Sequence, residues 1–146
     1  MTLVIEKIKM NKSKGFTIIE LLVVVAIIAV LTGIVLVNVT SYINKGRDAS
    51  IKGNLSTILT NGAVFYDTNS TYAGFCASTN VTVPQLAIAG AGGASTCTQN
   101  GTNTAWCACS TLKVTAGNVF CVDSTGVKKE SANTCALACP AAGACI

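Results

Sequence analysis

The stretch "GFTIIELLVVVAIIAV", residues 15–30, is uncharged except for one carboxylate, Glu20. After it, no charged residue occurs from Leu21 to Asn44. A helix needs roughly 20 apolar residues to cross a hydrocarbon core of about 30 Å. The run is long enough to span a membrane once, and no second run of that length follows in the sequence. The position of Glu20 inside this run is the feature that any functional interpretation has to explain.

The charge of the chain is concentrated before the apolar run. Residues 1–15 account for +3 of the formal net charge of +4, through Lys7, Lys9, Lys12 and Lys14 against Glu6. Basic residues flanking a membrane span stay on the cytoplasmic side, so we expect a cytoplasmic N-terminus and an external C-terminal region. Because the remaining residues are nearly neutral, the sequence does not favour nucleic acid as a partner.

The eight cysteines all lie in the second half of the chain. In an oxidising compartment, an even number of cysteines in a small domain indicates a disulfide framework. A zinc site is disfavoured because the chain has no histidine and no C-x-x-C pair. The pairing stays open, although Cys107 and Cys109 share one face of a strand and are not expected to bond each other. The disulfide candidates are Cys76, Cys97, Cys107, Cys109, Cys121, Cys135, Cys139 and Cys145.

The apolar pattern predicts one helix of about 50 residues, ~75 Å long, from Phe16 to Tyr66. Its second part carries a single apolar stripe, and no proline occurs before Pro84. We expect four segments: a basic leader (1–15), a transmembrane helix (16–39), an amphipathic outer helix (40–67) and a small Cys-rich β region (68–146). The stripe consists of Ile51, Leu55, Ile58, Leu59, Gly62, Phe65 and Tyr66.

The C-terminal region is rich in glycine, alanine and threonine and has few large apolar residues for a core. We expect a small β region here, which together with the long helix makes an α+β fold. Residues 87–96, "AIAGAGGAST", are expected to form a flexible loop. Residues 110–115, 118–122 and 127–130 are expected to form a three-stranded antiparallel meander against the outer helix. Because so small a core is weak, disulfides would have to supply much of the stability.

Three interpretations of Glu20 were considered. A signal anchor could tolerate a charge near the membrane surface, and a secretory signal peptide would fit poorly because its core seldom contains a charge. In the third, cleavage between Gly15 and Phe16 creates a positive α-amino group. Between staggered parallel helices, Glu20 of one chain could then pair with the amino group of the next and set their register.

Residues 14–31, "KGFTIIELLVVVAIIAVL", resemble the N-terminal signal of type IV pilins and type II secretion pseudopilins. The resemblance implies a lollipop-shaped fold, a prepilin peptidase that cleaves after Gly15 and N-methylates Phe16, and a register role for Glu20. It further implies a filament subunit that waits in the cytoplasmic membrane, is handled by a platform protein and an assembly ATPase, and polymerises with its own copies.

Alternatives to a pilus subunit are a major pseudopilin of a type II secretion system and a membrane-anchored Cys-rich binding module that does not polymerise. We expect no enzymatic activity, since histidine and a G-x-S-x-G motif are both absent from the sequence. No cofactor is expected. Pseudopilins often bind calcium, but Asp123 and Glu130 are the only carboxylates of the C-terminal region, too few to favour a calcium site.

Overall fold

The computed structural model describes residues 15–146, except for the side chains of Leu36 and Val37. The expected basic leader, apart from Gly15, lies outside the described residues. The chain divides into two units, residues 1–38 and 39–146, which are described separately. The first helix, α1 (Ile18–Asn69), is 52 residues long and contributes to both. The predicted α+β class is confirmed, with a long N-terminal helix, a small antiparallel sheet and four disulfides.

The prediction of one uninterrupted helix is confirmed, with its ends shifted by a few residues. It begins at Ile18, after Thr17, and ends at Asn69. Ser70 follows in the left-handed region with φ 55°, which the helix cannot continue through. In the second unit, most of the expected stripe packs inward, with Ile51, Leu55 and Ile58 fully buried, whereas Tyr66 at its end is 46% exposed.

The second unit has a four-stranded antiparallel sheet rather than the expected three-stranded meander. The strands β1 (Ser95–Gln99), β2 (Trp106–Thr111), β3 (Val119–Asp123) and β4 (Lys128–Ser131) follow one another in the order β1-β2-β3-β4. The strand expected at 110–115 in fact ends at Thr111. The chain leaves the ladder there because the backbone N–H groups of Lys113 and Val114 donate to the Asp48 carboxylate on α1.

The prediction of a flexible loop at residues 87–96 is also wrong. Its first residues belong to helix α2 (Thr79–Gly90) and its last two begin β1. Pro84 lies inside α2 and cannot donate to the carbonyl of Asn80, four residues earlier. The side-chain amide of Asn61, on α1, donates to that carbonyl instead at 2.8 Å. A tertiary contact thus satisfies the group that proline leaves without its helical partner.

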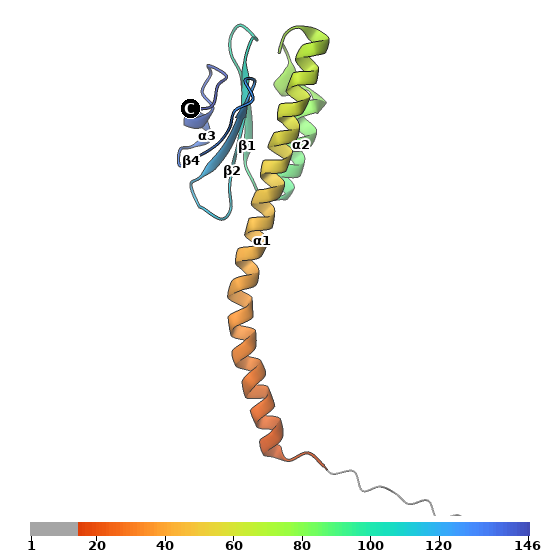
Figure 1. Ribbon diagram of the computed structural model, residues 1–146, viewed down its shortest axis with the longest axis vertical. Helices are drawn as coiled ribbons and strands as arrows, with labels where there is room; N and C mark the ends of the chain where they lie inside the picture. The colour runs from red at the N-terminus through yellow and green to blue at the C-terminus, as the bar shows by residue number, and fades with distance from the viewer. Residues whose placement is uncertain (1–14) are drawn as a thin grey trace, which may run out of the picture. The chain divides into compact units, whose positions relative to one another are not determined.

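Two layers cover the sheet of the second unit (Figure 1). The outer half of α1 (Val39–Asn69) and α2 lie over one face, and the short helix α3 (Cys135–Ala138) lies over the other. The central strand β2 is consequently buried on both faces, as its burial from Trp106 to Ser110 shows. Trp106 and Ala108 join the core beneath α1, and Cys107 and Cys109 point to the α3 side.

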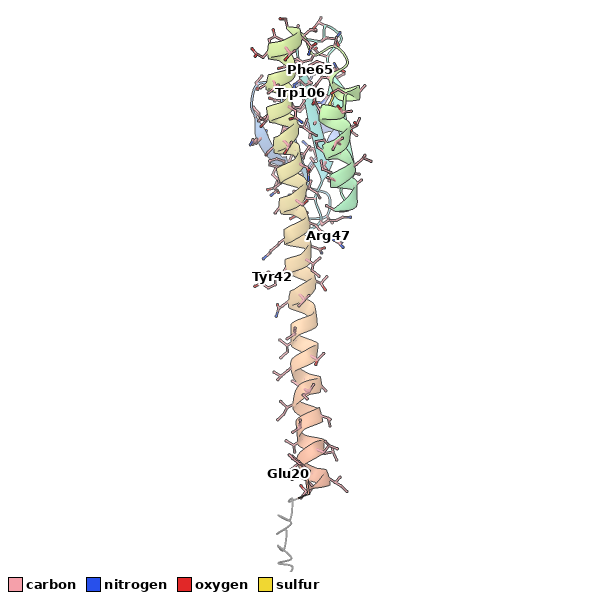
Figure 2. The ribbon with its side chains drawn as sticks, turned by 90° about the vertical axis from the view of Figure 1, so that its right-hand side faces the viewer. Glu20, Tyr42, Arg47, Phe65 and Trp106 are labelled. Atoms are coloured by element: carbon pink, nitrogen blue, oxygen red, sulfur yellow. A yellow bond between two sulfur atoms is a disulfide. The ribbon has the colours of Figure 1, made fainter. Side chains whose placement is uncertain are left out.

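An aromatic cluster fills the core around Trp106 (Figure 2). The ring of Trp106 lies 4.8 Å from that of Phe75, and Phe75 lies 5.2 Å from Phe65, between ring centroids. The indole also packs directly on Gly62 of α1: a Cβ atom there would lie 2.4 Å from Cζ2 of Trp106. Gly62 therefore lets the helix approach the sheet closely.

All eight cysteines form disulfides. A short 3-10 helix, η1 (Phe75–Ala77), is joined to β1 by Cys76–Cys97. Cys107–Cys139, Cys109–Cys135 and Cys121–Cys145 join α3 and the chain end to the sheet. Cys107 and Cys109 share a face, and each bonds a different partner. Three bridges therefore hold the layer opposite α1, where large apolar side chains are scarce.

Candidate assembly segment at the N-terminus

The expected cleavage junction lies in a non-helical segment. Gly15, Phe16 and Thr17 precede α1 and are exposed, and Phe16 is 84% exposed. A peptidase must take its substrate as an accessible, extended chain, because a helical backbone hides the carbonyl it attacks in intrahelical hydrogen bonds. The Gly15–Phe16 bond has this accessibility.

Thr17 and Glu20 form a capping box at the start of α1. The Glu20 carboxylate accepts from the backbone N–H and the hydroxyl of Thr17, both at 2.8 Å, and the Thr17 hydroxyl accepts from the Glu20 N–H at 3.3 Å. Figure 2 places Glu20 at this end of α1. Reciprocal bonds of this kind satisfy backbone donors that a helix start leaves free. The carboxylate that looked misplaced in the sequence therefore has a local role in a single chain.

Thr17 is a functional candidate that the sequence interpretation missed. The signal was present, because Thr17 and Glu20 have the T-x-x-E spacing that precedes an apolar run at many helix starts. Both bonds that the Glu20 carboxylate accepts end on the same oxygen, Oε2. Among residues 15–146, Oε1 has no recorded hydrogen bond, so the carboxylate keeps an acceptor for a further donor.

The N-terminal half of α1 (residues 18–38) is covered by apolar side chains that nothing among residues 15–146 buries. Its large residues are exposed by roughly half or more, from Val24 at 47% to Ile18 at 81%. An 18-residue window within α1 has a mean hydropathy of 3.0, and none of it is buried. By length and composition α1 can cross a membrane, and the same surface can pack against other helices.

Residues 10–36 match the family described as the prokaryotic N-terminal methylation motif. The N-terminal segment is pilin-like. A stretch of 47 residues is 45% identical to the type IV major alpha-pilin of Moraxella bovis, and another match of the same length and identity is fimbrial protein Q of that organism. Each match covers 32% of this chain and 30% of the relative, so the chain matches less than a third of these relatives' length. No solved structure matches the chain.

The family resemblance stated from the sequence is confirmed for the pilin-like segment, residues 10–36. The family description concerns methylation near the N-terminus, and the two relatives are named as a pilin and a fimbrial protein. Gly15, Phe16 and Glu20 all lie in the matched range. Their roles in cleavage, methylation and assembly stay predictions.

The two carboxylates weighed for calcium are engaged in separate contacts. Asp123 is buried at the end of β3 and accepts from the hydroxyl and N–H of Thr125 and from the N–H groups of Val127 and Cys145. Burial by itself would raise the pKa of Asp123, but these hydrogen bonds outweigh it and lower the pKa below its usual range. Glu130 lies on β4 opposite Phe120 and pairs with Lys52 at 2.9 Å.

Proposed function

We propose that the chain is a structural subunit of a type IV pilus-like filament. It is inserted in the cytoplasmic membrane as a prepilin, cleaved after Gly15, N-methylated at Phe16 and polymerised through the N-terminal half of α1. The observation that carries the proposal is the coincidence, within residues 10–36, of the methylation motif with a helix whose apolar side chains are exposed all round.

Cleavage changes what Glu20 can bind. Hydrolysis of the Gly15–Phe16 bond leaves a carboxylate on the leader and an ammonium on Phe16, and methylation keeps that charge. In a single chain, Glu20 accepts neutral donors from Thr17. A hydrogen bond from an ammonium is roughly twice as strong as one from a neutral donor. In an apolar bundle of helices, Glu20 of one subunit is therefore expected to accept a hydrogen bond from the terminal ammonium of the next subunit.

A pilus subunit is preferred here to a secretion pseudopilin because both curated relatives carry pilus names, major alpha-pilin and fimbrial protein. The two functions differ in where the filament ends. Immunogold labelling of intact cells should decorate long surface filaments if the chain is a pilus subunit, whereas a pseudopilin would stay within the envelope.

The first test concerns processing. Mass spectrometry of the protein extracted from membranes should show a chain that starts at Phe16 and carries one additional methyl group. Co-expression with an inactive prepilin peptidase is the matched control and should leave the leader attached. A chain that still starts at Met1 or Met10 in cells with active peptidase would reduce the protein to a membrane anchor.

The second test separates the charge of Glu20 from its capping role. Glu20→Val should be cleaved normally but give few filaments. Glu20→Gln keeps an oxygen that can accept from Thr17 and loses the charge, so it should also be cleaved and fail to assemble. Asp67→Asn, which removes an exposed acid at the other end of α1, is the control and should assemble normally. Normal filaments from Glu20→Gln would overturn the ammonium pairing.

A further inference from the structure

Three exposed cations lie at the end of the second unit where the chain enters it. Lys45 and Arg47 lie on the first turns of the outer half of α1, and Lys113 lies in the loop after β2. The contact between Asp48 and the backbone of Lys113 and Val114 brings this loop to the helix. One open pocket there is lined by Lys45, Asp48, Ala49, Lys52, Val114, Thr115 and Glu130. Segments far apart in the sequence thus carry cations to the same end of the second unit.

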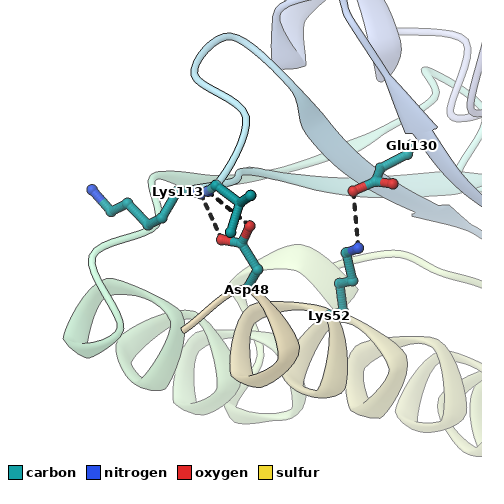
Figure 3. A network of polar contacts seen from close by, with 5 residues as sticks. Asp48, Lys52, Lys113 and Glu130 are labelled. Carbon is teal, nitrogen blue, oxygen red and sulfur yellow. Dashed lines mark hydrogen bonds and ion pairs between the residues drawn. The ribbon is translucent and has the colours of Figure 1, made fainter. Parts of the chain in front are cut away.

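The acidic side chains of this region are engaged in contacts with other groups. Asp48 is only 7% exposed, and its two oxygens accept the N–H groups of Lys113 and Val114 at 2.5 and 3.0 Å (Figure 3). Glu130 is paired with Lys52 at 2.9 Å. With Asp48 counted, Lys45, Arg47 and Lys113 leave a net charge of +2 at this end. The Lys52–Glu130 pair is also partly exposed, but its two charges cancel, so the excess charge here comes from the three cations.

An aromatic side chain adjoins one of the cations, Lys45. Tyr42 is 70% exposed, and the ammonium of Lys45 lies 5.4 Å from the centroid of its ring. Figure 2 shows Tyr42 and Arg47 projecting from neighbouring turns of α1. Tyrosine is enriched where a membrane span meets water, since its ring suits the headgroup layer and its hydroxyl reaches water. Tyr42 lies near the C-terminal end of the uncharged run, where such a boundary is expected.

Lys113 is held at this end by a second contact. Its Cε and Nζ atoms lie close to Gly92, where an added Cβ would be 2.8 Å from Cε. Gly92 follows the last residues of α2, whose carbonyl end attracts a cation. The side chain in Figure 3 extends away from Asp48. The Lys113 ammonium therefore does not fold back to neutralise Asp48.

We propose that Tyr42, Lys45, Arg47 and Lys113, here called the collar, bind the anionic headgroups of the membrane in which the subunit waits. The phosphate oxygens accept from the cations, and the Tyr42 ring lies at the headgroup level. The inference rests on the proposed function for the presence of a membrane span. Because cleavage would remove the basic leader, the collar would hold the basic side chains that still flank the span, on its external side.

The test uses the full chain in neutral detergent micelles, titrated with short-chain phosphatidylglycerol and followed by the NMR signals of Tyr42, Lys45 and Arg47. Phosphatidylcholine of the same chain length and inorganic phosphate are the comparison ligands. Phosphatidylglycerol should shift these signals with saturation, and the other two should not. Equal shifts with phosphatidylcholine or with free phosphate, or no shift at all, would overturn the proposal.

A matched pair of variants isolates the collar. Lys45→Gln/Arg47→Gln should weaken phosphatidylglycerol binding about 30-fold, as expected for two cations near an anionic surface. Lys128→Gln/Lys129→Gln removes the same charge from β4 and should change it by less than about twofold. An unchanged Trp106 indole signal verifies folding. If both variants lost the same affinity for phosphatidylglycerol, binding would depend on net charge alone, and the assignment of the lipid site to the collar would be wrong.

Two outcomes separate this inference from others. Collar signals that shift with protein concentration in the absence of lipid would assign the surface to a second copy of the chain and overturn the lipid assignment. Lipid binding does not require cleavage at Gly15, so it can be measured on the uncleaved chain. If the chain binds phosphatidylglycerol but is never processed in cells, lipid binding by the collar is supported and the proposed filament function is contradicted.

Discussion

The two halves of α1 are built from the same kinds of side chain and have opposite surroundings. Ile18, in the N-terminal half, is 81% exposed, and Ile51, in the outer half, is fully buried. Burial of such a side chain contributes about 1.5–3 kcal/mol. The outer half obtains this from α2 and the sheet of its own chain. The N-terminal half has no such partner among the described residues, so its apolar surface is left for lipid or for other subunits.

This difference shows which half of α1 depends on the exact shape of its side chains. The outer half meets one shaped surface, in which Gly62 has to admit the ring of Trp106. The N-terminal half needs only length, hydropathy and a defined start, and Thr17 with Glu20 supplies that start. Changes to the outer half should therefore alter folding, and changes to the N-terminal half should alter assembly. The four predictions below test this division.

Reduction of the disulfides should have the largest effect, and only on the second unit. Each bridge contributes about 2–4 kcal/mol, so the four together compare with the ~5–15 kcal/mol that stabilises a typical domain. After complete reduction of the full chain in micelles, amide hydrogen exchange should become fast in β2 and stay slow in the N-terminal half of α1. Retained protection in β2 would show that the core holds without its cross-links.

Gly62→Ala should destabilise the second unit by about 1–3 kcal/mol, because the new Cβ overlaps the Trp106 ring. Gly53→Ala is the matched control on the same half of the helix. Nothing lies within 4 Å of a Cβ at Gly53, so alanine there should stabilise by about 0.5–1 kcal/mol. Urea unfolding followed by Trp106 fluorescence measures both. Equal effects of the two variants would contradict the close approach at Gly62.

The second unit should lose stability in acid partly through Asp123. Its folded pKa is lowered, so its contribution is present above the unfolded aspartate pKa of about 3.9 and is lost as the pH falls through the folded value. Urea unfolding should show the free energy decreasing over this range. Asp123→Asn should flatten the decrease, and the exposed Asp67→Asn should leave it unchanged. An equally steep decrease in Asp123→Asn would assign the acid sensitivity to other groups.

Thr17→Ala should have the smallest effect, confined to the start of α1. Loss of a helix cap costs about 0.5–2 kcal/mol, and here it frays only the first turn. Amide exchange of Ile18, Ile19 and Glu20 should accelerate, while unfolding of the second unit should not change. Thr17→Ser keeps the hydroxyl and should restore the slow exchange. Unaltered exchange in Thr17→Ala would mean that the capping box adds nothing in solution.

The sequence predicted the features that depend on local pattern. The 3.6-residue period and the absence of early prolines predicted α1, and the confinement of cysteines to one region predicted a disulfide framework. The position of Glu20 drew attention to the helix start. Its partner Thr17 was missed although the T-x-x-E spacing is visible, because a carboxylate in an apolar run suggests a charged partner more strongly than a hydroxyl.

The features that were missed depend on contacts between distant residues. The strand β1, "STCTQ", has no large apolar residue and gains its place through pairing with β2. Helix α2 contains a proline that Asn61 compensates from another helix. The end of β2 is decided by Asp48, some sixty residues earlier in the chain. None of these has a signature within its own segment.

By itself, the sequence determined the long helix, the pilin-like segment and the oxidised C-terminal region, because hydropathy, charge order and cysteine content act over short stretches of chain. The tertiary structure alone decided the fourth strand, the four cysteine pairings and the collar around Lys45. These require residues from separate segments to be held within a few ångströms of one another, and that distance is set by packing rather than by the order of amino acids.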